Sequence, residues 1–106
     1  MNQKNKYKKL KQKIGSKEYT LYVANTPKKR KLGLSKMKIN NREGMIFIYP
    51  EPIKNLTFTM KNTNKKLKLI FVNENEEIVH QAIGMPNQTK NIVCPFLAKY
   101  VIEILG

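Results

Sequence analysis

Few residues in this chain could carry out acid–base, nucleophilic or metal chemistry. His80 and Cys94 are the single histidine and the single cysteine, and the chain contains no aspartate. A nucleophilic cysteine needs a base beside it, and His80 is 14 positions away in the sequence. With one histidine and one cysteine, no zinc cluster of the usual kind can form. We therefore expect no catalytic residue, no metal site and no cofactor. His80 is expected at the surface or in the core, and Cys94 as a small buried hydrophobic residue.

One polar cluster could bind a ligand. Lys61, Asn62 and Thr63 follow Met60 at the end of an apolar segment. If the fold brings them near Arg30, they could hold an anion or the backbone of a partner protein. The alternative is structural, with Met60 in the core, Asn62 shaping a turn and Thr63 bonding locally. The sequence leaves both interpretations open.

The charge of the chain is high and unevenly distributed. The formal net charge is +14; residues 1–42 hold 14 Lys and Arg against Glu18, and the remainder holds 7 against 6 glutamates. Basic charge concentrated in one half indicates a polyanionic partner such as nucleic acid or an acidic protein surface. A coding bias is the alternative, because the chain has 19 Lys and 12 Asn but only 2 Arg. Such a bias explains the abundance of lysine but not its position.

Two segments carry most of this charge. We expect residues 1–13 to form a flexible basic arm, because they contain too little apolar surface to order themselves. Alternatively, a tight turn at Gly15-Ser16 pairs Leu10–Ile14 with the following strand. The second segment is a short basic helix. The predicted partner-binding residues are Lys4, Lys6, Tyr7, Lys8, Lys9, Lys11, Lys13, Lys28, Lys29, Arg30 and Lys31.

The elements that must position these residues are mostly strands. Alternation of apolar and polar residues predicts strands at 18–24, 56–61, 78–83 and 100–105. Continuous apolar runs predict buried strands at 45–49, ended by Pro50 and Pro52, and at 67–72. The strand at 67–72 is expected to pair with the strand at 56–61.

The helix has clear end signals. Thr26 is the expected N-cap and Pro27 the first helical residue. The helix is expected to reach about Leu34, with Leu32 and Leu34 facing inward and Gly33 close to its end. Residues 14–106 then form a single globular domain. We predict an α+β, mostly β fold, with five or six strands in a small barrel-like antiparallel or mixed sheet and one short helix.

Five motifs in order resemble the domain of unknown function 192 family: Arg30–Leu34, Gly44–Phe47, Phe58–Thr63, Leu67–Val72 and Tyr100–Ile104. The resemblance implies a compact, mostly β fold with little helix and no settled activity. The chain departs from the family at Ser35, where Met is usual, at Thr59, where Trp is usual, and at Lys68, where Asp is favoured. Together the departures predict a retained fold with altered or lost ligand chemistry.

These observations favour a non-enzymatic interaction module whose basic arm and helix dock an acidic protein surface or nucleic acid. The first alternative is a structural or assembly component of a phage virion, in contact with neighbouring subunits. The second is an uncharacterised enzyme or small-ligand binder. No apolar run approaches the roughly 20 residues of a membrane span, and the N-terminus lacks the apolar centre of a signal peptide. We therefore expect a cytoplasmic or virion location.

Overall fold

The computed structural model of the chain describes residues 3–34 and 37–106. Ser35, one of the departures from the family pattern, lies outside these ranges. Within them the chain forms η1 (Gln3–Lys6), β1 (Lys9–Ile14), β2 (Lys17–Ala24), α1 (Pro27–Leu32), β3 (Glu43–Ile53), β4 (Leu56–Phe58), β5 (Leu67–Val72), β6 (Ile78–Gly84), β7 (Ile92–Cys94) and β8 (Ala98–Leu105), where η1 is a 3-10 helix.

The strands form one large mixed sheet and one small sheet. The large sheet has the order β1-β2-β3-β8-β5-β6, and β4 pairs with β7 in the second sheet. β2 and β3 are parallel, whereas the other neighbours are antiparallel. The prediction of a mostly β fold with a mixed sheet and one short α-helix is confirmed. The sheet keeps β1 and β6 as open edges, so "barrel-like" describes it loosely. Its six strands agree with the predicted five or six, and β4 and β7 form the second sheet in addition.

The N-terminal segment is more ordered than a flexible arm. Lys9–Ile14 form β1 and pair antiparallel with β2, around a turn in which Gly15 has φ of 64°. The hairpin alternative is therefore correct, and the expectation of a flexible arm through residue 13 is wrong for β1. The physical reason is that Leu10 and Ile14 pack beside the buried Leu21, which a free arm could not do.

Two predicted strand boundaries change in the structure. β3 continues through Pro50 and Pro52 to Ile53, because its register against β8 shifts between Ile48 and Ile53 and the prolines lie within that irregularity. The strand predicted at 56–61 ends at Phe58.

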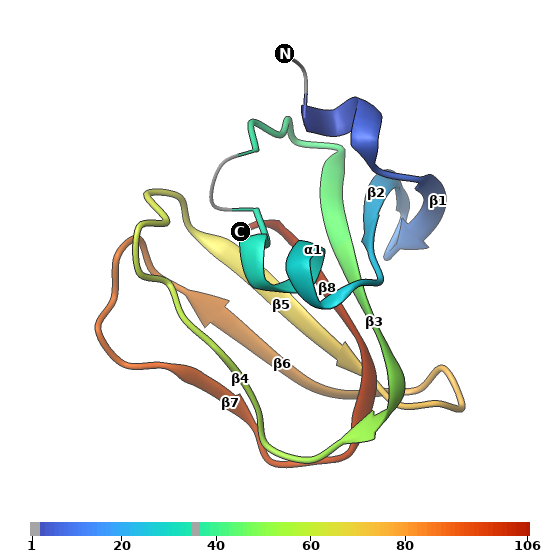
Figure 1. Cartoon of the computed structure of the whole chain (residues 1–106), viewed down its shortest axis with the longest axis vertical. Helices are drawn as coiled ribbons and strands as arrows, with labels where there is room; N and C mark the ends of the chain where they lie inside the picture. Colours follow the sequence, from blue (N-terminus) through green and yellow to red (C-terminus); the bar gives the residue numbers. More distant parts are fainter. Residues whose placement is uncertain (1–2, 35–36) are drawn as a thin grey trace.

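The predicted pairing of 67–72 with 56–61 is also wrong. β5 instead lies between β8 and β6, and β4 pairs with β7, a strand that is absent from the predicted elements. Figure 1 shows β4 and β7 running side by side, apart from the large sheet.

The large sheet buries side chains on both faces. On one face, Phe47, Leu69, Phe71 and Val101 join a core that includes Leu56, Met60, Ile92 and Cys94 from the β4–β7 region and Leu34 after α1. The other face is smaller, with Leu21, Ile70, Ile102 and Ile104. Figure 1 shows α1 in front of the central strands on the first face. Leu34 is buried as predicted, but Leu32 is 41% exposed, so its predicted inward position is wrong.

Candidate ligand pocket

A pocket of about 400 Å³ lies among α1, the first face of the large sheet and the segment that follows β4. The cations Arg30, Lys31 and Lys61 line it, together with Asn62 and Thr63. One of the two interpretations left open by the sequence had Lys61, Asn62 and Thr63 as a polar cluster near Arg30. The structure brings all four residues to this one pocket, although Arg30 and Lys61 are 31 positions apart.

The caps of α1 fix where Arg30 points. Thr26 is the N-cap and accepts a hydrogen bond of 3.2 Å from the Lys29 backbone N–H, and Gly33 is the C-cap with φ of 54°. Arg30 donates from Nη1 to the Ile48 carbonyl oxygen at 2.9 Å. Its guanidinium carbon also lies 5.0 Å from the ring centroid of Tyr49. These contacts anchor the guanidinium to β3, at the edge of the pocket.

The segment after β4 is a turn with a buried anchor. Met60 is 1% exposed, and a Cβ on Gly84 would lie 2.5 Å from its sulfur, so β6 leaves room for this side chain. Asn62 has φ of 62°, and the Thr63 N–H donates to the Met60 carbonyl oxygen at 3.1 Å. The structural interpretation of Met60 and Asn62 is confirmed. This structural role is compatible with ligand binding, because the turn positions Lys61 and Thr63 at the wall of the pocket.

The sequence analysis missed the acidic residue of the pocket. Glu103 on β8 is 5% exposed and lines the cavity. Its neighbours in the ladders are Met45 on β3 and Leu69 on β5, both fully buried and apolar. Burial raises the pKa of this carboxyl to about 8. Among the described residues it makes no hydrogen bond or ion pair. The signal was present in the sequence as one glutamate inside the apolar run of residues 101–105.

Tyr49 is the second titratable group beside the cavity. Burial raises the pKa of Tyr49; the Arg30 guanidinium opposes this rise, and the Glu103 carboxyl adds to it. The pocket therefore has cations on α1 and on the turn after β4, a phenol on β3 and one carboxyl group on β8.

A second cavity, of about 420 Å³, lies on the other face of the sheet. Most of the side chains that line it are aliphatic and come from β1, β3, β5 and β8. No charged side chain among its described lining residues is buried. The first pocket is therefore the one in which polar groups are aimed at a potential ligand.

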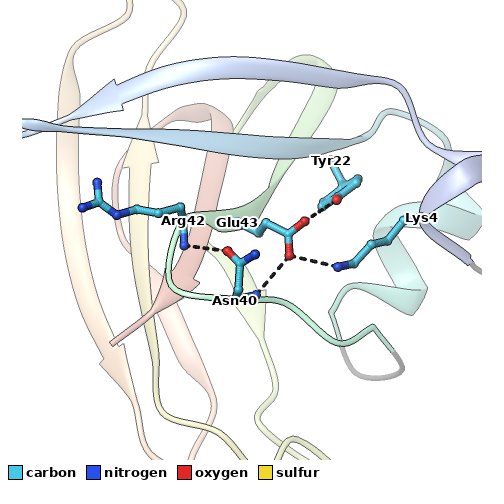
Figure 2. A network of polar contacts seen from close by, with 5 residues as sticks. All are labelled: Lys4, Tyr22, Asn40, Arg42 and Glu43. Carbon is cyan, nitrogen blue, oxygen red and sulfur yellow. Dashed lines mark hydrogen bonds and ion pairs between the residues drawn. The ribbon is translucent and has the colours of Figure 1, made fainter.

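Lys4, one of the predicted partner-binding cations, takes part in an internal network (Figure 2). Its Nζ lies 2.9 Å from Glu43 Oε1, which also accepts a hydrogen bond of 3.0 Å from the Asn40 N–H. The Tyr22 hydroxyl donates to Glu43 Oε2 at 2.5 Å. Burial would raise the pKa of Glu43, but these hydrogen bonds and the Lys4 charge outweigh it and lower the pKa. The network ties η1 to the start of β3.

The other predicted partner-binding residues divide between the pocket and the surface. Arg30 and Lys31 line the pocket. Lys29 is half-buried, with its Nζ 5.1 Å from the ring centroid of the half-buried Tyr7, so α1 lies beside the segment after η1. The exposed remainder are Lys6, Lys8, Lys9, Lys11, Lys13 and Lys28.

Cys94 and His80 both lie near Phe96. Cys94 is fully buried, as expected for a small hydrophobic residue, and its Sγ lies 3.5 Å from the Phe96 carbonyl oxygen. His80 is half-buried, and its ring packs between Phe71 at 5.5 Å and Phe96 at 6.3 Å. Within the described ranges, no three His, Cys, Asp or Glu side chains gather where they could hold a metal ion. No helix in those ranges has the length and apolarity to span a membrane.

The family assignment rests on most of the chain. The sequence model of the domain of unknown function 192 family, described as "Uncharacterized ACR", matches residues 9–106. The chain belongs to this family. The domain of unknown function 192 family carries no assigned activity, so membership confirms the resemblance without naming a function. No curated protein matches the chain.

Two solved structures share the fold of this domain of unknown function 192 member. The first is a candidate transcription regulator from Sinorhizobium meliloti 1021, with a TM-score of 0.82 and 23% identity, covering 94% of this chain and 82% of that one. The second is a protein of unknown function from Novosphingobium aromaticivorans DSM 12444, with a TM-score of 0.78 and 25% identity, covering 94% and 74%.

The departures from the family pattern lie in different places. Thr59 lines the pocket. Lys68 pairs in register with Ile104, whose side chain belongs to the core of the opposite face. The expectation of altered ligand chemistry can therefore apply to the pocket through Thr59 but not through Lys68.

Proposed function

We propose that this protein is a non-enzymatic binding module that holds a small anionic ligand in the pocket between α1 and the turn after β4. The observation that carries the proposal is the convergence of Arg30, Lys31 and Lys61 on one cavity. Cations that surround a partly enclosed space attract an anion more strongly than cations on an open surface, because water screens them less.

The pocket also offers neutral hydrogen-bonding groups. Asn62 and Thr63 line it beside the cations, as do the hydroxyl-bearing Thr57 and Thr59. This combination of fixed charge and a few polar groups in a mostly formed concavity is typical of sites for small ligands. Catalysis is not part of the proposal, because the described lining residues of the cavity include no cysteine, serine or histidine.

A matched pair of variants tests this function. Lys31→Ala combined with Lys61→Ala removes two exposed cations of the pocket, and Lys17→Ala combined with Lys90→Ala removes two exposed cations elsewhere. We expect inorganic phosphate and citrate, titrated by calorimetry at about 0.15 M salt, to bind the parent and the Lys17/Lys90 variant alike. The Lys31/Lys61 variant should bind at least tenfold more weakly. Equal affinity in both variants, or no binding to the parent, contradicts the proposal.

A second candidate function is docking of a polyanion such as nucleic acid on the basic half. The observation that favours it is the Lys29–Tyr7 contact of 5.1 Å, which places the first basic segment beside the basic helix. The Sinorhizobium meliloti structure is described as a transcription regulator, which would agree with nucleic-acid binding. At 23% identity, however, the similarity shows only that the two proteins share a fold.

Substitutions test this second function better than truncation, because deletion of residues 1–13 would remove most of β1. We expect binding to a DNA duplex to weaken steeply as salt rises. Replacing Lys6, Lys8 and Lys11 with Gln should weaken binding and reduce the salt dependence, whereas the same change at Lys54, Lys65 and Lys90 should have a smaller effect. Absent or salt-insensitive binding removes this candidate.

A further inference from the structure

Glu103 adds one acidic group to a pocket otherwise lined by cations and neutral residues. The cations of the pocket belong to α1 and to the turn after β4, whereas Glu103 belongs to β8 in the middle of the large sheet. In the described structure no cation reaches its carboxyl group with an ion pair or hydrogen bond. The cavity is therefore lined by cations that can take an anion and by one carboxyl group that makes no hydrogen bond or ion pair with the described protein residues.

An ionised carboxyl group in this position destabilises the fold unless a ligand supplies a counter-charge. It is 5% exposed and stands between Met45 and Leu69, which offer no hydrogen bond. Burying an ionisable group without a partner is unfavourable, and the cost falls when a counter-charge arrives. A ligand that carries a cationic group would supply that counter-charge from inside the cavity.

We propose that the ligand of this pocket is a small zwitterion of the amino-acid type, with its ammonium group on Glu103 and its anionic group on Arg30, Lys31 and Lys61. This inference rests on the proposed function, to which it adds a partner for a cationic group. A zwitterion can pair its anionic group with the cations and its ammonium group with the ionised Glu103, whereas a simple anion or a simple amine makes only one of these pairings. The cavity of about 400 Å³ lies at the small end of ligand sites.

Proton release would accompany the binding of such a ligand. Burial raises the pKa of Glu103 to about 8, so at pH 7 the carboxyl is largely protonated, and pairing with an ammonium group requires it to ionise. The other charged or titratable groups that face the cavity are Arg30 and Lys31 from α1, Tyr49 from β3 and Lys61 from the turn.

Calorimetry with matched probes tests the inference. The probes are glycine, β-alanine, 4-aminobutyrate and 6-aminohexanoate, each compared with the carboxylate and with the primary amine of the same chain length. At one or more lengths the amino acid should bind at least tenfold more tightly than both counterparts. Titrations at pH 7 in two buffers of different ionisation enthalpy should show net release of up to one proton with the amino acid, and none with the carboxylate.

The outcomes separate the two proposals. If the carboxylate binds as tightly as the amino acid, or if no proton is released, the zwitterion is wrong and the anion-binding function stands. If neither binds at any length, the zwitterion is wrong, and the titrations with phosphate and citrate decide whether the anion-binding function stands. Glu103→Gln should retain carboxylate binding and lose the tenfold preference and the proton release. The buffer comparison uses the parent protein, so the test does not depend on the folding of this variant.

Discussion

Glu103 lies directly opposite Leu69 in the antiparallel ladder between β8 and β5. The pairing places an ionisable group beside a fully buried aliphatic side chain in the middle of the large sheet. The protonation of Glu103 therefore affects both the stability of the fold and the charge of the pocket, because its carboxyl group is buried in the sheet and also lines the cavity.

The stability of the protein should fall as the pH rises from about 5 to about 8. The pKa of Glu103 is raised above its ordinary value of 4.5 to about 8, so in this range the folded state holds a proton that the unfolded state has lost. At 1.36 kcal/mol per unit, the loss in the free energy of unfolding is on the order of 5 kcal/mol. Urea denaturation of the parent and of Glu103→Gln at several pH values from about 5 to about 8 measures this fall in the free energy of unfolding. Glu103→Gln should flatten the slope and the exposed Glu51→Gln should keep it; a parent curve without a slope would refute the prediction.

Tyr22 and Glu43 should be energetically coupled. The hydrogen bond of 2.5 Å between them joins a buried phenol to a carboxylate that Lys4 also holds. We expect a double-mutant cycle of Tyr22→Phe and Glu43→Gln to give a coupling of about 1–3 kcal/mol, as for hydrogen bonds to charged groups. The exposed pair Lys11–Glu18, at 3.8 Å, is the matched control and should give less than about 1 kcal/mol. Equal coupling in the two cycles would mean that the network in Figure 2 does not stabilise the fold.

The Tyr22–Glu43 network should make the stability of the protein fall at both low and high pH. The pKa of Glu43 is lowered in the folded protein. Its contribution to stability is therefore full above the ordinary carboxyl pKa and is lost as the pH falls through the pKa that Glu43 has in the folded state. The pKa of Tyr22 is raised to about 12 by burial and by Glu43. Its contribution is full below pH 10 and is lost as the pH rises toward 12. Ultraviolet titration of the phenol should show its midpoint shifting down in Glu43→Gln.

Gly44→Ala should destabilise the protein strongly. A Cβ at this position would lie 2.3 Å from the Glu103 carbonyl oxygen and 2.7 Å from Ile104 Cγ2, so β3 and β8 would have to separate. We expect a loss of about 2–4 kcal/mol in thermal or urea unfolding, in the range of a strained, overpacked core. At Gly15 an added Cβ meets nothing within 4 Å, and only the φ of 64° is unfavourable. Gly15→Ala should therefore cost about 1 kcal/mol, and similar losses at the two positions would contradict the close approach of β3 and β8.

Thr59→Trp should block the pocket without changing its charge. Thr59 is exposed and lines the cavity, and its Oγ1 accepts a hydrogen bond of 3.0 Å from the Lys61 N–H. The indole should occupy space that a ligand needs and lower the affinity for phosphate at least tenfold, while the lost hydrogen bond costs about 1 kcal/mol of stability. Thr89→Trp, at an exposed position outside the pocket, is the control. Unchanged affinity in the Thr59 variant would place the ligand elsewhere.

Local patterns in the sequence predicted the elements of the fold well. Thr26 and Pro27 mark the start of α1, because a side-chain acceptor and a fixed φ act within one turn of helix. Alternating or continuous apolar residues located β2, β5 and β6, since periodicity depends on neighbours in the chain. The grouping of Lys61 with Arg30 was one of two interpretations left open by the sequence. The residue types indicated that the cluster could bind an anion, but only the fold could show that Lys61 and Arg30 lie at the same pocket.

Strand partners and the burial of charge were decided by the tertiary structure. Periodicity assigns a face to each side chain but not a neighbour to each strand. The sequence alone therefore could not indicate that β5 lies between β8 and β6 while β4 pairs with β7. For the same reason Glu103 looked like an ordinary member of an alternating strand. Its carboxyl group becomes a nearly buried polar group among apolar neighbours only when β3 and β5 pair on both sides of β8. Composition and local pattern thus determined a mostly β, strongly basic chain, and contacts between distant segments created its pocket.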